Sequence, residues 1–281
     1  MPTQQPSPTP TPTPIDFPAS LKPIIHLPPN NKPTNAIVFF PGLGDTADNF
    51  ASFPRALNLP DALTITLNPP YPLPFPLGPG AQWSEDLQVD TSTGNLDADS
   101  PLTKAAELIA KDVIQEVLLD KFGFRPDHVH LFGFGQGGSL ALSVPLHPSL
   151  SPLTLGGIVS IGGSLPLSMP LPSASTGTGT NTGTNTGTNT GTNTGTGTGK
   201  STFKNKTPIL LLSGSKSPLA SVDSSPLKRI KSVYEFVTYH RWKKADDSMP
   251  KNREEVLPMM QFWARTLRSR RGVPDDAVEI G

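Results

Sequence analysis

The sequence contains no cysteine, which excludes disulfide bonds, a cysteine nucleophile and thiolate metal sites. Cysteine-free chains fit a reducing compartment, and we expect a cytoplasmic protein. Lysine plus arginine equals aspartate plus glutamate at 23 each, so the chain lacks the basic excess of nucleic-acid-binding proteins and we expect no nucleic-acid partner. No window reaches the roughly 20 apolar residues of a membrane span. The start has neither a charged segment nor an apolar core, so we expect no signal peptide.

Proline and glycine are abundant instead, at 34 and 25 residues, and they concentrate in segments that have little to bury. Residues 1–20, which begin with a proline- and threonine-rich run, are predicted to be a disordered tail. Residues 173–203 contain a GTNT repeat and are predicted to be a disordered insert. Residues 269–281 are predicted to be a flexible tail. One domain, residues 21–268, remains.

Within this domain, unbroken apolar runs alternate with helical patterns. Strands are predicted at residues 22–27, 36–40, 63–67, 157–163, 208–212 and 232–239. Helices are predicted at residues 49–57, 101–123, 225–231 and 252–267. Apolar rather than alternating strands, separated by helices, predict a single α/β domain with a mostly parallel sheet flanked by helices.

A long irregular segment, residues 68–100, interrupts this alternation. It is dense in proline and carries Trp83. Loops of this length are unusual in a compact domain and often cover a site. We therefore expect this segment to lie beside the functional residues.

The domain is organised around residues 130–142, where an apolar run enters a glycine cluster and a small-residue helix leaves it. This layout suits a nucleophile elbow, G-x-S-x-G, whose strained turn presents a serine. Here the centre of the elbow is Gly135. Read literally, Gly133, Gly135 and Gly138 match the dinucleotide pattern G-x-G-x-x-G instead.

The dinucleotide interpretation requires an acidic residue about 20 positions after the glycines, to hold the ribose. No aspartate or glutamate occurs between Asp127 and Asp223. Several strands also precede the glycine turn, although this fingerprint normally follows the first strand of its unit. A nucleotide-binding protein is therefore our third hypothesis.

An earlier loop favours the hydrolase interpretation. In α/β-hydrolases one oxyanion-hole amide comes from a loop after an early strand, and the other from the residue after the nucleophile. PGLGDT at residues 41–46 is such a loop, and Gln136 follows the elbow centre. Together with GFGQGG at residues 133–138 and Trp83 with its neighbours, these motifs resemble the acyl-protein thioesterase/carboxylesterase family of small α/β-hydrolases.

The resemblance covers about residues 24–267, apart from the repeat. It implies a compact α/β-hydrolase fold and a family that cleaves thioesters or carboxylic esters of acyl chains. It also implies a pocket with an oxyanion hole. The residues expected there are Gly42, Leu43, Gly44, Gln136 and Trp83.

The chain departs from the family pattern at each catalytic position. Gly135 replaces the nucleophile, Ser217 stands at the acid position, and the stretch 247–249, with Ser248, lacks the histidine base. We therefore predict a non-catalytic pseudo-hydrolase with a binding or interaction role, without a cofactor. Its partner would be an acyl or ester small molecule or a protein.

An active esterase or thioesterase remains the alternative hypothesis. The family order of nucleophile, acid and base allows one other set, Ser139, Asp223 and His240. Ser139 lies about 6 Å along the helix axis from the elbow, at 1.5 Å per residue, away from the oxyanion amides. We therefore favour the interpretation in which Ser139 is a small packing residue on this helix.

A metal site is not expected. The acidic pairs Asp246–Asp247 and Glu254–Glu255 are adjacent in sequence, and no HExxH spacing occurs. His128 and His130 can share one face of a strand, but no third ligand accompanies them.

Overall fold

The computed structural model describes residues 11–75, 77–85, 87, 102–171, 204–221 and 224–269. The repeat insert 173–203, Asp223 and the C-terminal residues 270–281 lie outside the described residues. None of the helices in the described part of the chain combines the length and hydropathy that crossing a bilayer requires.

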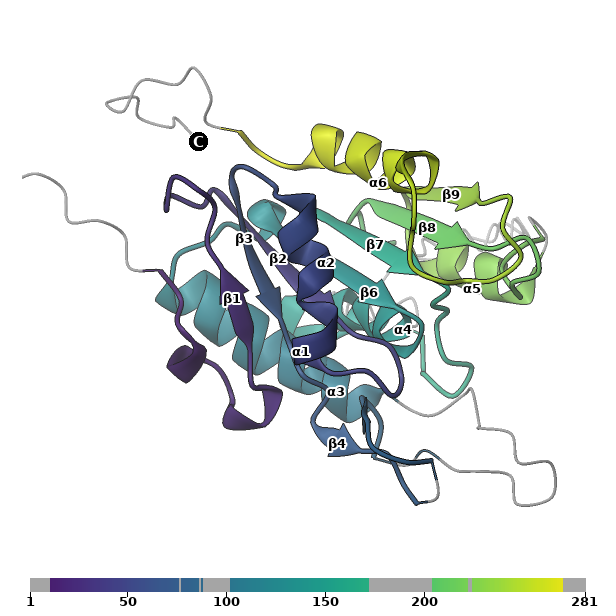
Figure 1. Cartoon of the computed structure of the whole chain (residues 1–281), viewed down its shortest axis with the longest axis horizontal. Coiled ribbons are helices and arrows are strands. Elements are labelled where there is room, and N and C mark those ends of the chain that lie inside the picture. Colours follow the sequence, from purple (N-terminus) through teal and green to yellow (C-terminus); the bar gives the residue numbers. More distant parts are fainter. Residues whose placement is uncertain are drawn as a thin grey trace, which may run out of the picture.

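A seven-stranded sheet forms the centre of the molecule, in the order β1-β3-β2-β6-β7-β8-β9 (Figure 1). Only β1 is antiparallel to its neighbour; the other five pairings are parallel. The strands are β1 (Ile24–His26), β2 (Asn35–Phe40), β3 (Ala62–Thr66), β6 (Val129–Phe134), β7 (Gly157–Ile161), β8 (Ile209–Ser213) and β9 (Val237–Arg241). The predicted mostly parallel α/β sheet is confirmed.

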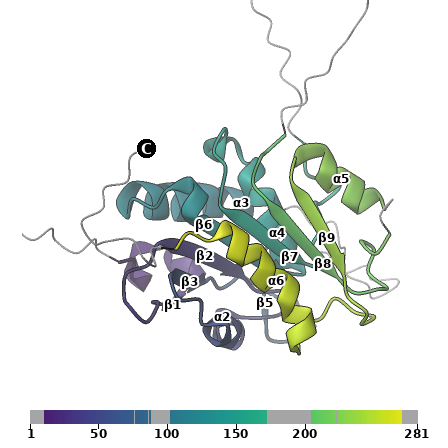
Figure 2. The ribbon, with the colours of Figure 1, turned by 90° about the horizontal axis from the view of Figure 1, so that it is seen from above.

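Helices cover both faces of the sheet. The helices are α1 (Ala47–Phe50), α2 (Ser52–Leu57), α3 (Thr103–Leu108), α4 (Gln136–Ser143), α5 (Ser225–Val233) and α6 (Arg253–Thr266). The π-helical η3 (Ile109–Lys121) continues α3, and short turns are η4 (Pro126–His128), η5 (Val144–Leu146) and η6 (Pro148–Leu150). Figure 2 shows α2 and α6 on one side of the sheet and α3 and α5 on the other.

Two hydrophobic clusters hold these layers together. The parallel strands are buried on both faces and apolar at nearly every position, so they supply side chains to a cluster on each face. The first cluster joins one sheet face to η3, α4 and α5, and contains Leu140, Ile109 and Leu211. The second joins the opposite face to α1 and α6, and contains Leu212 and Trp263. Alternate residues of each strand therefore serve opposite clusters.

The folded part of the chain begins earlier than predicted. The disordered tail was expected to reach residue 20, but η1 (Pro14–Asp16) and η2 (Ala19–Leu21) precede the domain. Phe17 is buried against the first cluster, and Lys121 pairs with Asp16 at 2.6 Å. Phe17 and Leu21 supply apolar burial that holds this segment on the domain.

Two further elements differ from the sequence prediction. Residues 232–239 were predicted as a strand, yet α5 runs to Val233 and the strand begins at Val237. The buried Val233 continues the apolar stripe of α5, and this tertiary packing outweighs strand propensity. The segment after residue 67 contains a short hairpin of β4 (Tyr71–Pro72) and β5 (Ala81–Gln82). The predicted helix 252–267 is confirmed as α6.

Candidate functional site

The elbow lies at the carboxyl end of the central strand β6, where α4 begins. Gly135 occupies the turn with φ +52° and ψ −117°, a backbone conformation that side chains rarely adopt. Its amide donates to the Ile161 carbonyl at 2.8 Å, which anchors the turn to β7. A Cβ built on Gly135 meets no atom within 4 Å. The turn is thus strained and sharp, and the space a nucleophile side chain would occupy is open.

The glycines that frame the elbow have no such space. A Cβ on Gly133 would lie 2.1 Å from the Gly137 carbonyl oxygen, and one on Gly137 would lie 2.2 Å from that of Phe40. A Cβ on Gly138 would meet the Ser160 hydroxyl at 2.7 Å. These short distances show that the backbones of the strand, the turn and the helix pack directly against one another. Close packing therefore requires glycine at 133 and 137, but not at the centre of the elbow.

The loop after β2 lies directly against the elbow. A Cβ on Gly42 would meet the Phe134 ring at 2.8 Å. Within the described chain, no acceptor is recorded for the backbone amides of Leu43 and Gln136, whereas the neighbouring Gly44 amide donates to Ala81 at 2.8 Å. Two free amides from the two expected segments are what an oxyanion hole needs.

Trp83 joins these two segments. Its backbone amide donates to Oε1 of Gln136 at 2.8 Å, and its indole Nε1 donates to the Pro41 carbonyl at 2.9 Å. The side chain is buried, and its ring meets Phe40 edge to face at 5.5 Å between centroids. Trp83 thus links the loop after β2 to the start of α4.

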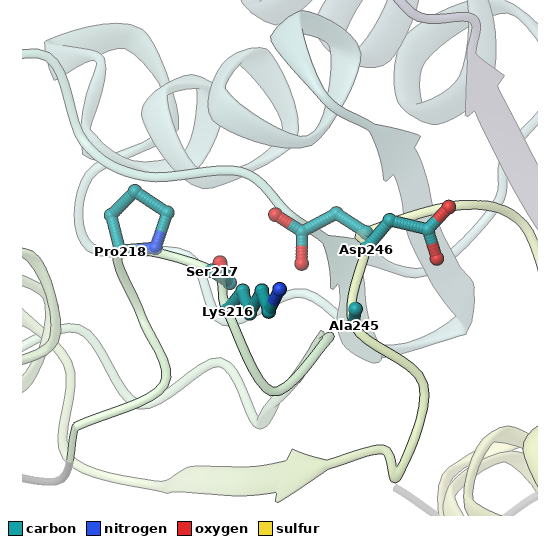
Figure 3. A pocket seen from close by; sticks show the side chains of 6 residues that line it. Lys216, Ser217, Pro218, Ala245 and Asp246 are labelled. Atoms are coloured by element: carbon teal, nitrogen blue, oxygen red, sulfur yellow. The ribbon is translucent and has the colours of Figure 1, made fainter.

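The loops after β8 and β9 carry the expected acid and base positions, and the structure brings them together. Ser215 donates to Lys244 at 2.8 Å and Lys216 donates to Ala245 at 3.0 Å, both between backbones. A pocket of about 270 Å³ lies between the loops (Figure 3). Its lining residues are Lys216, Ser217, Pro218, Ala245, Asp246 and Asp247.

The expected acid position, Ser217, and the expected base position, Ser248, do not form an acid–base pair. The Ser217 hydroxyl accepts a hydrogen bond from the Leu219 amide at 3.3 Å. The Ser248 hydroxyl donates to the Asp246 carboxylate at 3.1 Å, and Ser248 does not line the pocket. The residues at these positions therefore satisfy local hydrogen bonds.

Asp247 makes contacts in the structure that the sequence did not predict. Its carboxylate accepts the Gly214 amide at 2.7 Å, and a Cβ on Gly162 would lie 2.8 Å from the Asp247 Cβ. Gly162 follows Ile161, which accepts the amide of Gly135. Asp247 therefore faces the loop beside the elbow. The sequence placed it in the stretch 247–249 expected at the base position, but did not predict these contacts.

The alternative catalytic set is distributed differently. The Ser139 hydroxyl donates to Gly135 at 3.4 Å and accepts the Ser164 amide at 3.0 Å, so it bridges two backbones. His240 pairs with Leu212 and shares its sheet face, which α6 covers, whereas α4 packs on the opposite face. Ser139 and His240 are thus separated by the sheet. Asp223 lies outside the described residues.

No group of three potential metal-ligating His, Asp or Glu side chains occurs among the described residues. His128 points one ring nitrogen at the Thr34 carbonyl, 3.1 Å away. His130 is fully buried, and neither of its ring nitrogens has a partner. Burial lowers the pKa of His130 to about 3, so its imidazole is neutral.

Comparisons with known proteins agree with this geometry. A family model described as Phospholipase/Carboxylesterase matches residues 24–186. An uncharacterized hydrolase of Schizosaccharomyces pombe is 34% identical over 146 residues, 51% of this chain and 58% of its own length. Acyl-protein thioesterase 1 of Saccharomyces cerevisiae is 32% identical over 135 residues, 45% of this chain and 56% of its own length. The matches thus span little more than half of each relative.

Among solved structures, the crystal structure of esterase PE8 is similar with a TM-score of 0.61 at 15% identity. The match covers 87% of this chain and 98% of the esterase chain. At this identity the likeness concerns the fold, and it confirms the predicted α/β-hydrolase architecture.

Proposed function

The chain belongs to the phospholipase/carboxylesterase family of α/β-hydrolases, and from this we propose that it is a non-catalytic member that binds acyl compounds through a carboxylate or ester carbonyl. A family hydrolase needs a nucleophile at the elbow and a base within hydrogen-bond reach. Here the elbow centre is Gly135, and the base stretch 247–249 consists of an aspartate, a serine and a methionine.

The observation that carries the proposal is the contrast within the elbow. A Cβ added to Gly133 or Gly137 would lie only 2.1 or 2.2 Å from a backbone carbonyl oxygen, whereas the Cβ direction of Gly135 is open. The protein thus retains the strained turn and its open space without the side chain that would use them. A retained elbow backbone without its nucleophile side chain supports a binding role rather than a catalytic one.

The ligand class follows from the free amides of Leu43 and Gln136. One amide at the start of α4 and one in the loop after β2 favour a carboxylate or a polarised carbonyl oxygen, because charge-assisted hydrogen bonds exceed neutral ones in strength. We expect an acyl carboxylate to accept from these amides, and the open Cβ direction of Gly135 leaves space for the atoms bonded to it.

The competing hypothesis is an active hydrolase that uses Ser139, Asp223 and His240. Against it stand the two backbone contacts of the Ser139 hydroxyl and the location of His240 on the other sheet face. A general base must approach its nucleophile to about 3 Å. These contacts favour a packing role for Ser139.

Isothermal titration calorimetry with octanoate, beside turnover of p-nitrophenyl octanoate, tests the proposal. We expect saturable octanoate binding and ester turnover at the background rate. Turnover that Ser139→Ala or His240→Ala abolishes would instead establish the competing hypothesis. Absence of octanoate binding together with absence of turnover would contradict the acyl-binding role.

Two variants at Gln136 locate the bound oxygen. Gln136→Pro removes the backbone donor at the first helical position, where proline is tolerated, whereas Gln136→Ala keeps it. Loss of one charge-assisted hydrogen bond should weaken octanoate binding roughly 10–100-fold in Gln136→Pro relative to Gln136→Ala. Equal affinity in both variants would place the carboxylate elsewhere.

A further inference from the structure

Among the described residues, no strand pairs with the outer edge of β9. Strand β9 pairs only with β8 among the described residues, and it forms one end of the sheet (Figures 1 and 2). Thr238, His240 and Arg241 are exposed, and the Phe236 side chain is 52% exposed. Such an edge offers a row of backbone donors and acceptors to another strand.

The hydrogen bonds to β8 fix which residues present those groups. Ile209 donates to Phe236 at 2.8 Å, and Trp242 donates to Ser213 at 2.8 Å. Backbone groups alternate along a strand, so the residues with even numbers from Phe236 to Trp242 point towards β8. Val237, Tyr239 and Arg241 therefore point their amides and carbonyls outwards.

We propose that two copies of this chain associate through antiparallel pairing of their β9 edges, with the two-fold axis at Tyr239. In this register Tyr239 meets Tyr239 of the second copy, and Val237 meets Arg241. All three outward-pointing residues then become hydrogen-bonded pairs. A shift by one residue would place inward-pointing groups opposite outward-pointing ones.

Charge supports the same register. The backbone continues beside its neighbour on both sides of β9, because Glu235 donates to Asn205 and Ser215 donates to Lys244. With the axis at Tyr239, Glu235 lies opposite Lys243 of the second copy and diagonal to its Arg241. Opposite charges in facing positions stabilise strand pairing and like charges oppose it. The segment is thus self-complementary about one residue.

An isologous pairing of this kind needs no second surface, because each copy supplies the same edge. It would extend the sheet continuously across both domains. The inference concerns the face at β9 and is independent of the acyl-binding site at the elbow, so either proposal can fail without the other.

Sedimentation velocity of the full chain up to about 100 µM tests the pairing in the concentration range of modest interfaces. We expect a reversible dimer. Glu235→Lys and Lys243→Glu should each weaken association about tenfold, and the double variant should restore it. Glu254→Lys, the same charge change on an exposed residue of α6, should leave association unchanged.

Tyr239→Pro provides a second test, because it deletes an outward amide while sparing the backbone hydrogen bonds to β8. Tyr239→Phe is its control, because it likewise loses the 2.8 Å hydrogen bond between the Tyr239 and Ser213 hydroxyls but keeps the outward amide. Tyr239→Pro should be monomeric, with its circular dichroism verifying the fold. A wild-type protein that stays monomeric at about 100 µM would overturn the proposal. Single charge reversals that weaken the dimer without rescue in the double variant would overturn the register.

Discussion

The backbone amide of Trp83 donates a 2.8 Å hydrogen bond to the side-chain oxygen of Gln136, across 53 positions of sequence. Gln136 also carries one of the two amides of the site that have no acceptor among the described residues, and the Trp83 indole donates to the carbonyl of Pro41 in the loop that carries the other. One buried residue therefore fixes the relative position of the two segments that carry these amides.

Trp83→Phe keeps the buried ring and removes the indole donor to Pro41. Leaving a buried carbonyl without its donor should cost about 1–3 kcal/mol of unfolding free energy, and octanoate binding should weaken. Urea denaturation and calorimetry measure the two effects. Trp242→Phe is the matched control, because the Trp242 indole donates to Glu255 at 3.2 Å, away from the elbow. It should lower stability without changing octanoate affinity.

Gly135→Ser restores the nucleophile side chain to a site that can hold it. The open Cβ direction predicts no clash, and the positive φ predicts a cost of about 1–3 kcal/mol in unfolding free energy. Ester turnover should stay at background, because neither Ser217 nor Ser248 can act as acid or base. Chemical denaturation and p-nitrophenyl octanoate hydrolysis measure these effects.

The control for this variant is the triple change Gly135→Ser, Ser217→Asp and Ser248→His. It should give more turnover than Gly135→Ser alone, since it supplies a full set in the family order. Efficient hydrolysis by Gly135→Ser alone would mean that a base already present, such as Asp247, serves the elbow.

The sequence predicted the sheet because buried parallel strands have a continuous apolar signal, and β2, β6, β7 and β8 each carry it. It predicted the elbow because only glycine fits the close contacts at Gly133 and Gly137. It did not place β9, whose edge position exposes alternate residues and weakens the signal, nor the bonds of Trp83. Those bonds depend on chain segments far apart in sequence, which periodicity cannot relate.

His130 should make the fold acid-sensitive. Its folded-state pKa of about 3 lies below the unfolded value, so the unfolded chain binds a proton that the native chain excludes. Between the two pKa values, this group alone should lower stability by about 1.4 kcal/mol per unit as pH falls. Urea denaturation from pH 7.5 to pH 5 should show a shallower loss for His130→Leu. An unchanged slope would contradict a neutral, buried imidazole.

The repeat insert gives a separate test of the domain boundaries that we propose from composition. Deleting residues 175–199 should leave the melting temperature nearly unchanged, because a doubling of loop length costs only about 0.6 kcal/mol. Differential scanning calorimetry of both chains measures this. A drop of many degrees would mean that the repeat belongs to the folded domain.

The central claim is that this hydrolase fold has no activated serine. Intact-mass spectrometry after incubation with a fluorophosphonate probe tests it most directly, because the probe forms a covalent adduct with activated serine hydroxyls. The account predicts no adduct on the wild-type protein. A stoichiometric adduct that Ser139→Ala removes would contradict it.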